Sequence, residues 1–337
     1  MRIVVTGSEG HLGEALVGVL RAAGEDVVGL DLLPGPSTDV VGSVADRAVV
    51  ERVVEGADAV LHTATLHKPH VGSHSKQAFV DTNVTGTLNL LEAAVGAGVG
   101  AFVFTSTTSA FGRALTPATG APAAWITEEV APVARNVYGA TKTAAEDLCS
   151  LVHHEHGLPV VVLRTSRFFP EADDRDDVRA AFDDLNLKVN ELLYRRVDLQ
   201  DVVDAHRLAI DRAADIAFDR FIVSATTPFE PEDLAELRTD APAVLRRRVP
   251  AFEPVYAERG WRMFDAIERV YVNARARDVL GWAPRHDFAA ALERLAAGAD
   301  PRSPLAVAVG AKGYHGSVSR CVAPGAWRGD AGGARRA

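Results

Sequence analysis

The chain has only two cysteines among its 337 residues, Cys149 and Cys321, so no framework of disulfide bonds can hold it together. This low usage is typical of a reducing compartment, and we expect a cytoplasmic protein. No apolar run approaches the roughly 20 residues that cross a bilayer, so we expect no membrane span, and we expect no cleaved leader. The formal net charge of −9 disfavours a nucleic-acid partner.

The composition of the whole chain, 47% hydrophobic and 24% charged, is that of a globular protein with a sizeable core. Short valine-rich runs at 2–7, 26–31, 57–64, 100–107 and 158–165 predict buried strands. Stretches at 13–24, 46–56 and 86–98 have helical periodicity and lie between them. Apolar strands that alternate with helices predict an α/β fold, a doubly wound parallel sheet of the Rossmann type.

The pattern changes after residue 165. Residues 166–196 are acidic, then helical, and contain no apolar strand, which predicts an insertion over the sheet. We expect residues 1–165, completed by a helix and a strand in 197–225, to form the nucleotide-binding domain. Residues 166–196 and 226–308 then form a smaller C-terminal substrate-binding lobe, and residues 309–337, rich in Gly, Ala and Arg, a flexible tail.

The stretch TGSEGHLG places Gly7, Gly10 and Gly13 between the first predicted strand and helix. Glycines there permit a tight turn, a close approach of phosphates and close packing of the helix on the strand, while the helix start offers unpaired N–H groups to a diphosphate. Asp31 ends the next predicted strand, where a carboxylate accepts hydrogen bonds from the adenosine ribose. A 2′-phosphate would be repelled there, so the sequence predicts NAD rather than NADP.

Tyr138 and Lys142 stand one helical turn apart and share a helix face. A tyrosine has a reference pKa of about 10, which a neighbouring ammonium lowers by favouring the phenolate, so Tyr138 is a candidate acid/base. Upstream, hydroxyl residues 105–109 end a predicted strand. Such a row is either a cap of the strand end or a group of ligand contacts, because ligands bind at the carboxyl ends of parallel strands.

These segments together resemble the extended short-chain dehydrogenase/reductase family, in particular its NAD-dependent epimerase/dehydratase group of nucleotide-sugar enzymes. The resemblance covers about residues 1 to 300 and rests on TGSEGHLG, VLHTAT, DTNVTGTLNLLEAA, FVFTSTTSAFG, YGATK and ARDVLGWAPRHDFAAAL. It implies NAD as the cofactor and a homodimer in which the helices that begin near residues 83 and 137 pair with those of a second subunit.

The resemblance also implies roles for single residues. Thr107, Tyr138 and Lys142 take the catalytic positions, with Lys142 holding the nicotinamide ribose. The expected cofactor contacts are Gly7, Gly10, His11, Leu12, Gly13, Asp31, Ser43, Val44, Ala64, Asn83, Tyr138, Lys142 and Thr165. The expected contacts of a small carbohydrate substrate are His67, Thr108, Arg167, Asn186 and Arg195.

Departures from the family pattern limit the reaction. Thr108 and Ser109 stand where the family's 4,6-dehydratases have Asp-Glu, which disfavours dehydration. Arg167 replaces an Asn of the sugar-nucleotide segment, and Tyr194 replaces an Arg. Two functions stay open: an NAD-dependent epimerase of a sugar or nucleotide sugar that works through a transient ketone, and an NAD-dependent dehydrogenase or reductase of a smaller sugar, uronate or polyol. A non-catalytic NAD sensor is disfavoured by the intact catalytic positions.

Four histidines, His62, His67, His70 and His74, lie within sixteen residues of one another. No cysteine or carboxylate stands among them, and they do not share one predicted helix, so we expect no metal site. The segment around His67 and His70 is either a loop over the nicotinamide or a solvated loop.

Overall fold

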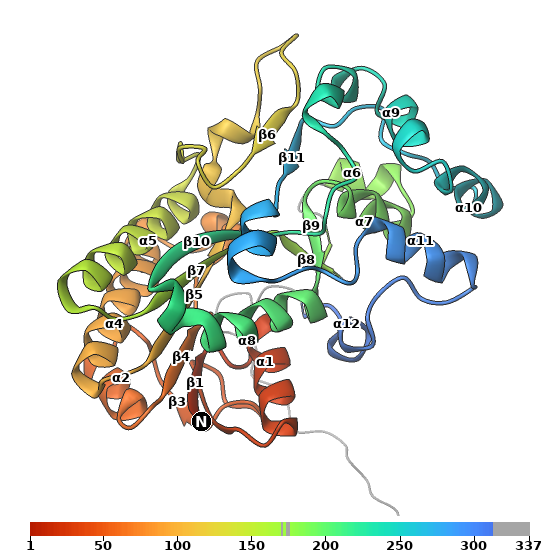
Figure 1. Ribbon diagram of the computed structural model, residues 1–337. Coiled ribbons are helices and arrows are strands. Elements are labelled where there is room, and N and C mark those ends of the chain that lie inside the picture. The colour runs from red at the N-terminus through yellow and green to blue at the C-terminus, as the bar shows by residue number, and fades with distance from the viewer. Residues whose placement is uncertain (170, 173–175, 313–337) are drawn as a thin grey trace, which may run out of the picture.

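The computed structural model describes residues 1–169, 171–172 and 176–312, and its centre is a seven-stranded parallel sheet (Figure 1). The strand order is β10-β7-β5-β4-β1-β2-β3. These strands are β1 (Arg2–Thr6), β2 (Asp26–Asp31), β3 (Val40–Val41), β4 (Ala59–His62), β5 (Ala101–Thr107), β7 (Val160–Thr165) and β10 (Phe218–Val223). The five predicted strands are therefore confirmed, as is the strand expected within residues 197–225.

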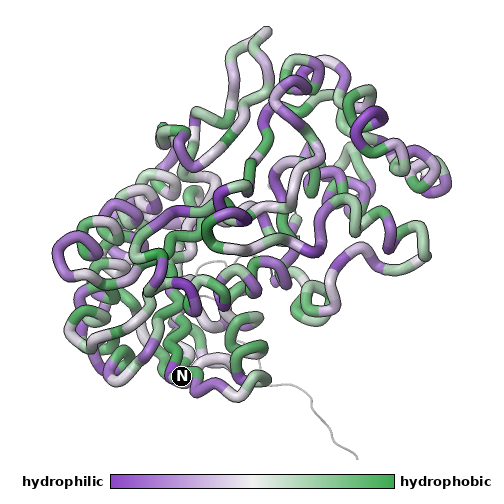
Figure 2. The backbone as a smooth tube through the Cα atoms, in the orientation of Figure 1, coloured by the Kyte–Doolittle hydropathy of each residue, from purple (hydrophilic) through white to green (hydrophobic). Residues whose placement is uncertain are grey.

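Helices cover both faces of the sheet, which confirms the doubly wound α/β fold. On one face α1 (His11–Ala22), α8 (Leu199–Ile216) and α12 (Pro304–Val309) pack against side chains such as Val5 and Leu61. On the other face α2 (Arg47–Val54), α4 (Gly86–Ala97) and α5 (Val137–His156) pack against their strand neighbours, such as Val4 and Val60. Alternate strand residues thus pack against helices on opposite faces, which is why these strands are largely apolar, as the green stretches of Figure 2 show.

A second core lies at the carboxyl end of the sheet, on the upper right of Figure 1. It includes Leu192, Leu245, Tyr256 and Phe288. The helices there are α7 (Asp184–Leu192), α9 (Ala241–Arg248), α10 (Phe252–Arg259) and α11 (Phe288–Ala296). Beside them β6 (Ala124–Ile126) and β11 (Arg269–Tyr271) form a separate two-stranded parallel sheet.

The segment after residue 165 differs from the prediction. Besides α6 (Asp176–Ala181) and α7, it contains β8 (Arg167–Phe169), which pairs in parallel with β9 (Arg196–Asp198). The prediction of no strand there was wrong because each strand has only three residues and begins with an arginine, so neither makes an apolar run. The helix α3 (Lys76–Val80) precedes a π-helical turn at Asp81–Thr85. Residues 313–337, most of the expected tail, lie outside the described residues.

The long helices of the described part of the chain are amphipathic, with one face on the sheet. None of them is both long enough and apolar enough to span a membrane.

Candidate active site

One pocket extends along the carboxyl ends of the central strands, from the glycine loop to the second core. It brings together most of the residues expected from the sequence: Gly7, Gly10, His11, Leu12, Gly13, Asp31, Ser43, Val44, Ala64, His67, Thr107, Thr108, Tyr138, Thr165, Arg167 and Arg195. Three expected residues, Asn83, Lys142 and Asn186, are not part of its wall.

The glycine loop has the shape that a dinucleotide diphosphate requires. Gly7 has φ +70°, a left-handed conformation that side chains rarely adopt, and a Cβ on it would come within 2.8 Å of the backbone of Ala64. A Cβ on Gly13 would overlap the carbonyl oxygen of Gly7, so close packing of α1 on the loop also requires glycine. α1 begins at His11, and its N-cap, Gly10, supplies no side-chain hydrogen bond to the first turn. The loop therefore fits the diphosphate of NAD.

Asp31 lies at the end of β2, where the adenosine half of the cofactor is expected. Its carboxylate is fixed by two backbone N–H donors, from Glu9 at 3.0 Å and Leu33 at 3.0 Å. Carboxylate oxygens have additional lone pairs for ribose hydroxyls. Ser43 and Val44 line the same pocket, and the Ser43 hydroxyl accepts a hydrogen bond from the backbone of Ala45.

Asn83 lies outside the pocket wall and binds the loop after β4, which lines the pocket. Its side-chain oxygen accepts hydrogen bonds from the Leu66 N–H (2.8 Å) and the Thr65 hydroxyl (3.0 Å), and its nitrogen donates to the Leu66 carbonyl and to Thr141 on α5. These bonds hold the loop after β4, and a direct contact of Asn83 with the cofactor stays a prediction. Ala64, in that loop, does line the pocket.

Tyr138 and Thr107 meet within the pocket. Both are buried, with 6% and 8% of their surface exposed. Burial raises the pKa of Tyr138 to about 12, and a hydrogen bond to Thr107 acts in the opposite direction. Tyr138 occupies the first turn of α5, whose N-cap Asn136 accepts a hydrogen bond from the backbone of Gly139. The two candidate catalytic hydroxyls thus come from the end of a strand and the start of a helix.

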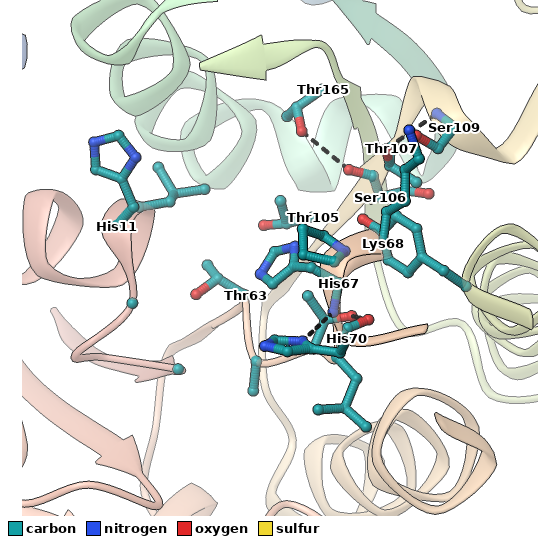
Figure 3. Close-up of a pocket in the computed structure, with 18 of the residues that line it drawn as sticks. His11, Thr63, His67, Lys68, His70, Thr105, Ser106, Thr107, Ser109 and Thr165 are labelled. Carbon is teal, nitrogen blue, oxygen red and sulfur yellow. Dashed lines mark hydrogen bonds between the residues drawn. The ribbon is translucent and has the colours of Figure 1, made fainter. Parts of the chain in front are cut away.

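Two hydroxyls of the row after Phe104 bind helices that cover the sheet. The Thr105 hydroxyl pairs with Nε2 of His206 on α8 at 2.8 Å, and the Ser106 hydroxyl donates to Glu146 on α5 at 2.5 Å. Both therefore hold helices to the sheet. All five residues of the row nevertheless line the pocket, and Figure 3 labels Thr105, Ser106, Thr107 and Ser109 there.

Lys142 points behind Tyr138 rather than into the pocket. Its Nζ donates to the carbonyl oxygen of Thr105 at 2.7 Å and lies 4.0 Å from the centre of the Phe104 ring. Burial lowers the pKa of Lys142 to about 7, and the charge of Glu146 opposes that shift. We expected Lys142 to lower the pKa of Tyr138, but that pKa is raised, because burial outweighs the effects that favour the phenolate.

The histidine-rich segment divides into a structural residue and a pocket loop. His62 is buried between the hydroxyls of Thr6 and Thr87. His67 projects into the middle of the pocket (Figure 3), with its ring centre 6.1 Å from that of Tyr138, and burial lowers its pKa to about 3, so its ring is neutral. Across the described ranges, no three His, Cys, Asp or Glu side chains are placed to bind a metal ion.

Arg167 and Arg195 line the pocket at the side of the second core. Asn186 does not: it is 2% exposed, and its side-chain oxygen accepts a hydrogen bond from the backbone of Arg262 at 3.2 Å. This bond joins α7 to the segment before β11, while the side-chain nitrogen of Asn186 has no hydrogen-bond partner in the described structure, and its contact with substrate stays a prediction.

Several pocket residues were missed by the sequence analysis, among them Lys68, Arg269, Tyr271 and Lys312. Lys312, near the end of the described chain, pairs with Glu14 and donates to the carbonyl oxygen of Glu9 at 3.1 Å. Nothing in its sequence neighbourhood marks it. Arg269 and Tyr271 lie in a three-residue strand that has no apolar period of its own.

The chain resembles known proteins along most of its length. It is 28% identical over 331 residues to a UDP-glucose 4-epimerase of Rhizobium meliloti, covering 86% of this chain and 94% of the relative. It is 36% identical over 192 residues to a dTDP-glucose 4,6-dehydratase of Streptomyces niveus, covering 50% and 55%.

Solved structures share the fold. A short-chain dehydrogenase/reductase superfamily protein from Agrobacterium tumefaciens with bound NAD has a TM-score of 0.62 and 24% identity, over 88% of this chain and 96% of that one. A UDP-galactose 4-epimerase structure has a TM-score of 0.60 and 22% identity, over 88% and 97%.

Residues 3–221 match the family model described as the NAD dependent epimerase/dehydratase family. This match contains the glycine loop, Asp31, the end of β5 and the start of α5, which form much of the pocket wall. The chain therefore belongs to the NAD-dependent epimerase/dehydratase family and is an NAD-dependent enzyme.

Proposed function

We propose that the protein is a sugar epimerase, acting on a nucleotide sugar, that inverts one carbon through a transient ketone. The observation that carries this proposal is that two buried residues, Tyr138 and Thr107, line the same pocket as the glycine loop. An acid/base beside a hydride acceptor is the minimum that reversible oxidation of an alcohol requires. The UDP-sugar and dTDP-sugar substrates of the named relatives support a nucleotide sugar.

In this proposal the three residues of the triad have separate tasks. Thr107 donates a hydrogen bond to the sugar oxygen, and Tyr138 as phenolate accepts the proton of that hydroxyl and returns it when the ketone is reduced. Lys142, as an ammonium on the same helix, favours the phenolate. NAD, when bound, takes a hydride from the carbon and gives it back. The inverted product forms when the ketone presents its other face.

Thr108 and Ser109 argue against water elimination. Elimination needs an acid and a base besides the Tyr138 phenol, and in the family's dehydratases Asp-Glu at these two positions supply them. Here Thr108 is 5% exposed, and the backbone of Ser109 donates to Thr107 at 3.1 Å. Alcohol groups are poor acids and bases near neutral pH, so we propose that the keto sugar is reduced rather than dehydrated.

The second candidate is net oxidation or reduction of a smaller sugar, uronate or polyol. Arg167 and Arg195 in the pocket wall favour it, because guanidinium groups suit the carboxylate of a small acid. The same triad would perform either reaction.

Incubation of the purified protein with UDP-glucose distinguishes the two reactions. Epimerisation gives UDP-galactose, identified by nuclear magnetic resonance, without net formation of NADH. Stoichiometric NADH and a stable oxidised product would refute the epimerase and support the dehydrogenase. Formation of a 4-keto-6-deoxy sugar would refute both.

We also propose a homodimer formed through α4 and α5. The two helices pack side by side (Figure 1), and Leu151 on α5 is 49% exposed, a large apolar residue directed to solvent. Light scattering should give twice the mass of the chain, and Leu151→Glu should shift the equilibrium toward monomer. A monomer at micromolar concentration would refute the proposal.

A further inference from the structure

Three segments that are far apart in the chain meet beside the glycine loop: the start of α1, the segment after β8 and the segment after α12. The carboxylate of Glu171, in the second segment, contacts the other two. It lies 2.7 Å from Nδ1 of His11, the first residue of α1, and accepts a hydrogen bond from the backbone N–H of Lys312. All three residues line the pocket. The junction therefore lies where the loop fits the diphosphate of NAD.

Glu171 is held firmly at this junction. The residue is 8% exposed, and burial by itself raises the pKa of its carboxyl group. The bonds from His11 and from the backbone of Lys312, with the charge of Arg196, outweigh burial, so the pKa is lowered and the group is a carboxylate at neutral pH. Arg196 is fully buried and also donates to the carbonyl oxygen of Glu171 at 2.8 Å, which fixes the main chain.

The side chain of Lys312 makes a second connection to the same place. Its Nζ donates to the carbonyl oxygen of Glu9 at 3.1 Å and pairs with Glu14 in the first turn of α1. Residues 9 and 14 flank the stretch 10–13, which offers its N–H groups to a diphosphate. Lys312 thus spans the part of the glycine loop that is expected to bind the cofactor.

The segment that carries Lys312 is anchored by the helix before it. Ser303, the N-cap of α12, binds the carboxylate of Asp198 through its hydroxyl at 2.5 Å and through its backbone N–H at 3.0 Å. Asp198 is itself the N-cap of α8. α12 packs against both α1 and α8 (Figure 1), so the chain leaves α12 beside the start of α1. The contacts of Lys312 therefore continue a packed structure.

We propose that His11, Glu171 and Lys312 form a clasp over the start of α1, which NAD has to pass on entry and on exit, so that exchange of the cofactor is slow. The bonds of the clasp join protein groups to one another. Breaking them therefore lowers the barrier to exchange without removing a contact with NAD.

The inference rests on NAD as the cofactor, which membership of the family establishes, and not on the choice between epimerase and dehydrogenase. Slow exchange suits the proposed epimerase in particular, because NADH is then formed and consumed within one turnover. The clasp residues are positioning residues, since none of them acts on the sugar.

The rate at which the protein releases NADH tests the clasp. Protein loaded with NADH is mixed with excess NAD, and the loss of NADH fluorescence gives the dissociation rate constant, while equilibrium titration gives the Kd. Glu171→Gln and Lys312→Met should each raise the rate constant about tenfold or more, because each loses hydrogen bonds of a charged group, and leave the Kd within about threefold. Glu253→Gln is the matched control, because Glu253 pairs with Arg246 on the surface of the second core.

Two results would overturn the inference. One is release of NADH at the wild-type rate by either folded variant; if Glu171→Gln does not fold, Lys312→Met decides. The other is a Kd that rises in parallel with the rate constant, which would show that the two residues bind the cofactor directly and do not control its exchange. Failure of the proposed function is separate, because this measurement uses no sugar, whereas the epimerase is tested by the product formed from one.

Discussion

The ammonium of Lys142 donates a 2.7 Å hydrogen bond to the carbonyl oxygen of Thr105, which joins the helix that carries Tyr138 to the strand that carries Thr107. One turn later, Glu146 accepts a hydrogen bond from Ser106, the next residue of the same strand. The positions of the two candidate catalytic hydroxyls therefore depend on two successive contacts between α5 and β5.

Glu146→Gln should shift the pH dependence of the reaction. Glu146 raises the pKa of Lys142, so its neutralisation lowers that pKa, and the ammonium is lost at lower pH. We expect the alkaline limb of the kcat profile to move to lower pH. Arg164, which pairs with Glu146 at 2.7 Å, also loses its buried counter-charge, at a cost of about 3–5 kcal/mol. Asp147→Asn, at an exposed neighbour, is the control, and an unmoved limb in Glu146→Gln would contradict this role.

Gly13→Ala should abolish retention of NAD and lower the free energy of unfolding by about 1–3 kcal/mol, because the new methyl overlaps the carbonyl of Gly7. Gly18→Ala in the same helix is the matched control. Gly18 is exposed, and a Cβ there meets nothing within 4 Å, so that variant should gain about 0.5–1 kcal/mol. Urea titration and the NAD content of the purified proteins measure both effects. Equal NAD content in the two variants would refute the tight fit of the loop.

Asp31→Ser should weaken NAD binding about tenfold or more and reduce the preference for NAD over NADP, because the carboxylate no longer accepts ribose hydroxyls or repels a 2′-phosphate. Asp39→Ser is the control, since Asp39 also accepts a backbone hydrogen bond, from Gly29 at 2.7 Å, but does not line the pocket. Fluorescence titration with NADH and NADPH gives the ratio of the two dissociation constants. An unchanged ratio in Asp31→Ser would place the ribose elsewhere.

Stability should fall as the pH falls below about 6.5. Loss of solvation in the folded protein lowers the pKa of His67 to about 3 and of His206 to about 4, from an ordinary histidine value of about 6.5. At a pH between the folded and the unfolded pKa values, the unfolded chain binds more protons than the folded protein. The free energy of unfolding therefore decreases as the pH falls through this range. Urea midpoints at pH 7 and pH 5 measure the loss, and His206→Gln should reduce it. A midpoint that does not depend on pH in this range would be inconsistent with two histidines that are neutral in the folded protein.

The sequence predicted the features that depend on local patterns. Strands apolar on both faces, glycines at a strand-to-helix turn and a Tyr-Lys pair one turn apart are all visible without a structure. The paired strands β8 and β9 were not, because their pairing joins residues far apart in the chain. Asn186 shows a second limit: a buried amide that holds α7 to the chain and an amide that binds substrate look the same in a sequence.

The role of Lys142 shows a third limit. Its spacing from Tyr138 predicts a shared helix face, but the direction of its ammonium depends on the Thr105 carbonyl and the Phe104 ring, which belong to another element. Likewise, the row of hydroxyls after Phe104 predicts a polar strand end but not which of them the neighbouring helices bind.

The reaction rate of Tyr138→Phe in protein that still holds NAD tests the central claim most directly. Removal of the phenol hydroxyl should reduce epimerisation at least about a hundredfold, because general acid/base catalysis contributes that much, while NAD content stays at the wild-type level. Tyr256→Phe is the matched control: it removes a buried hydroxyl that donates to Asn190 at 2.7 Å, outside the pocket, and should lower stability without a comparable loss of rate. A Tyr138→Phe enzyme that turns over its substrate at the wild-type rate would contradict the account.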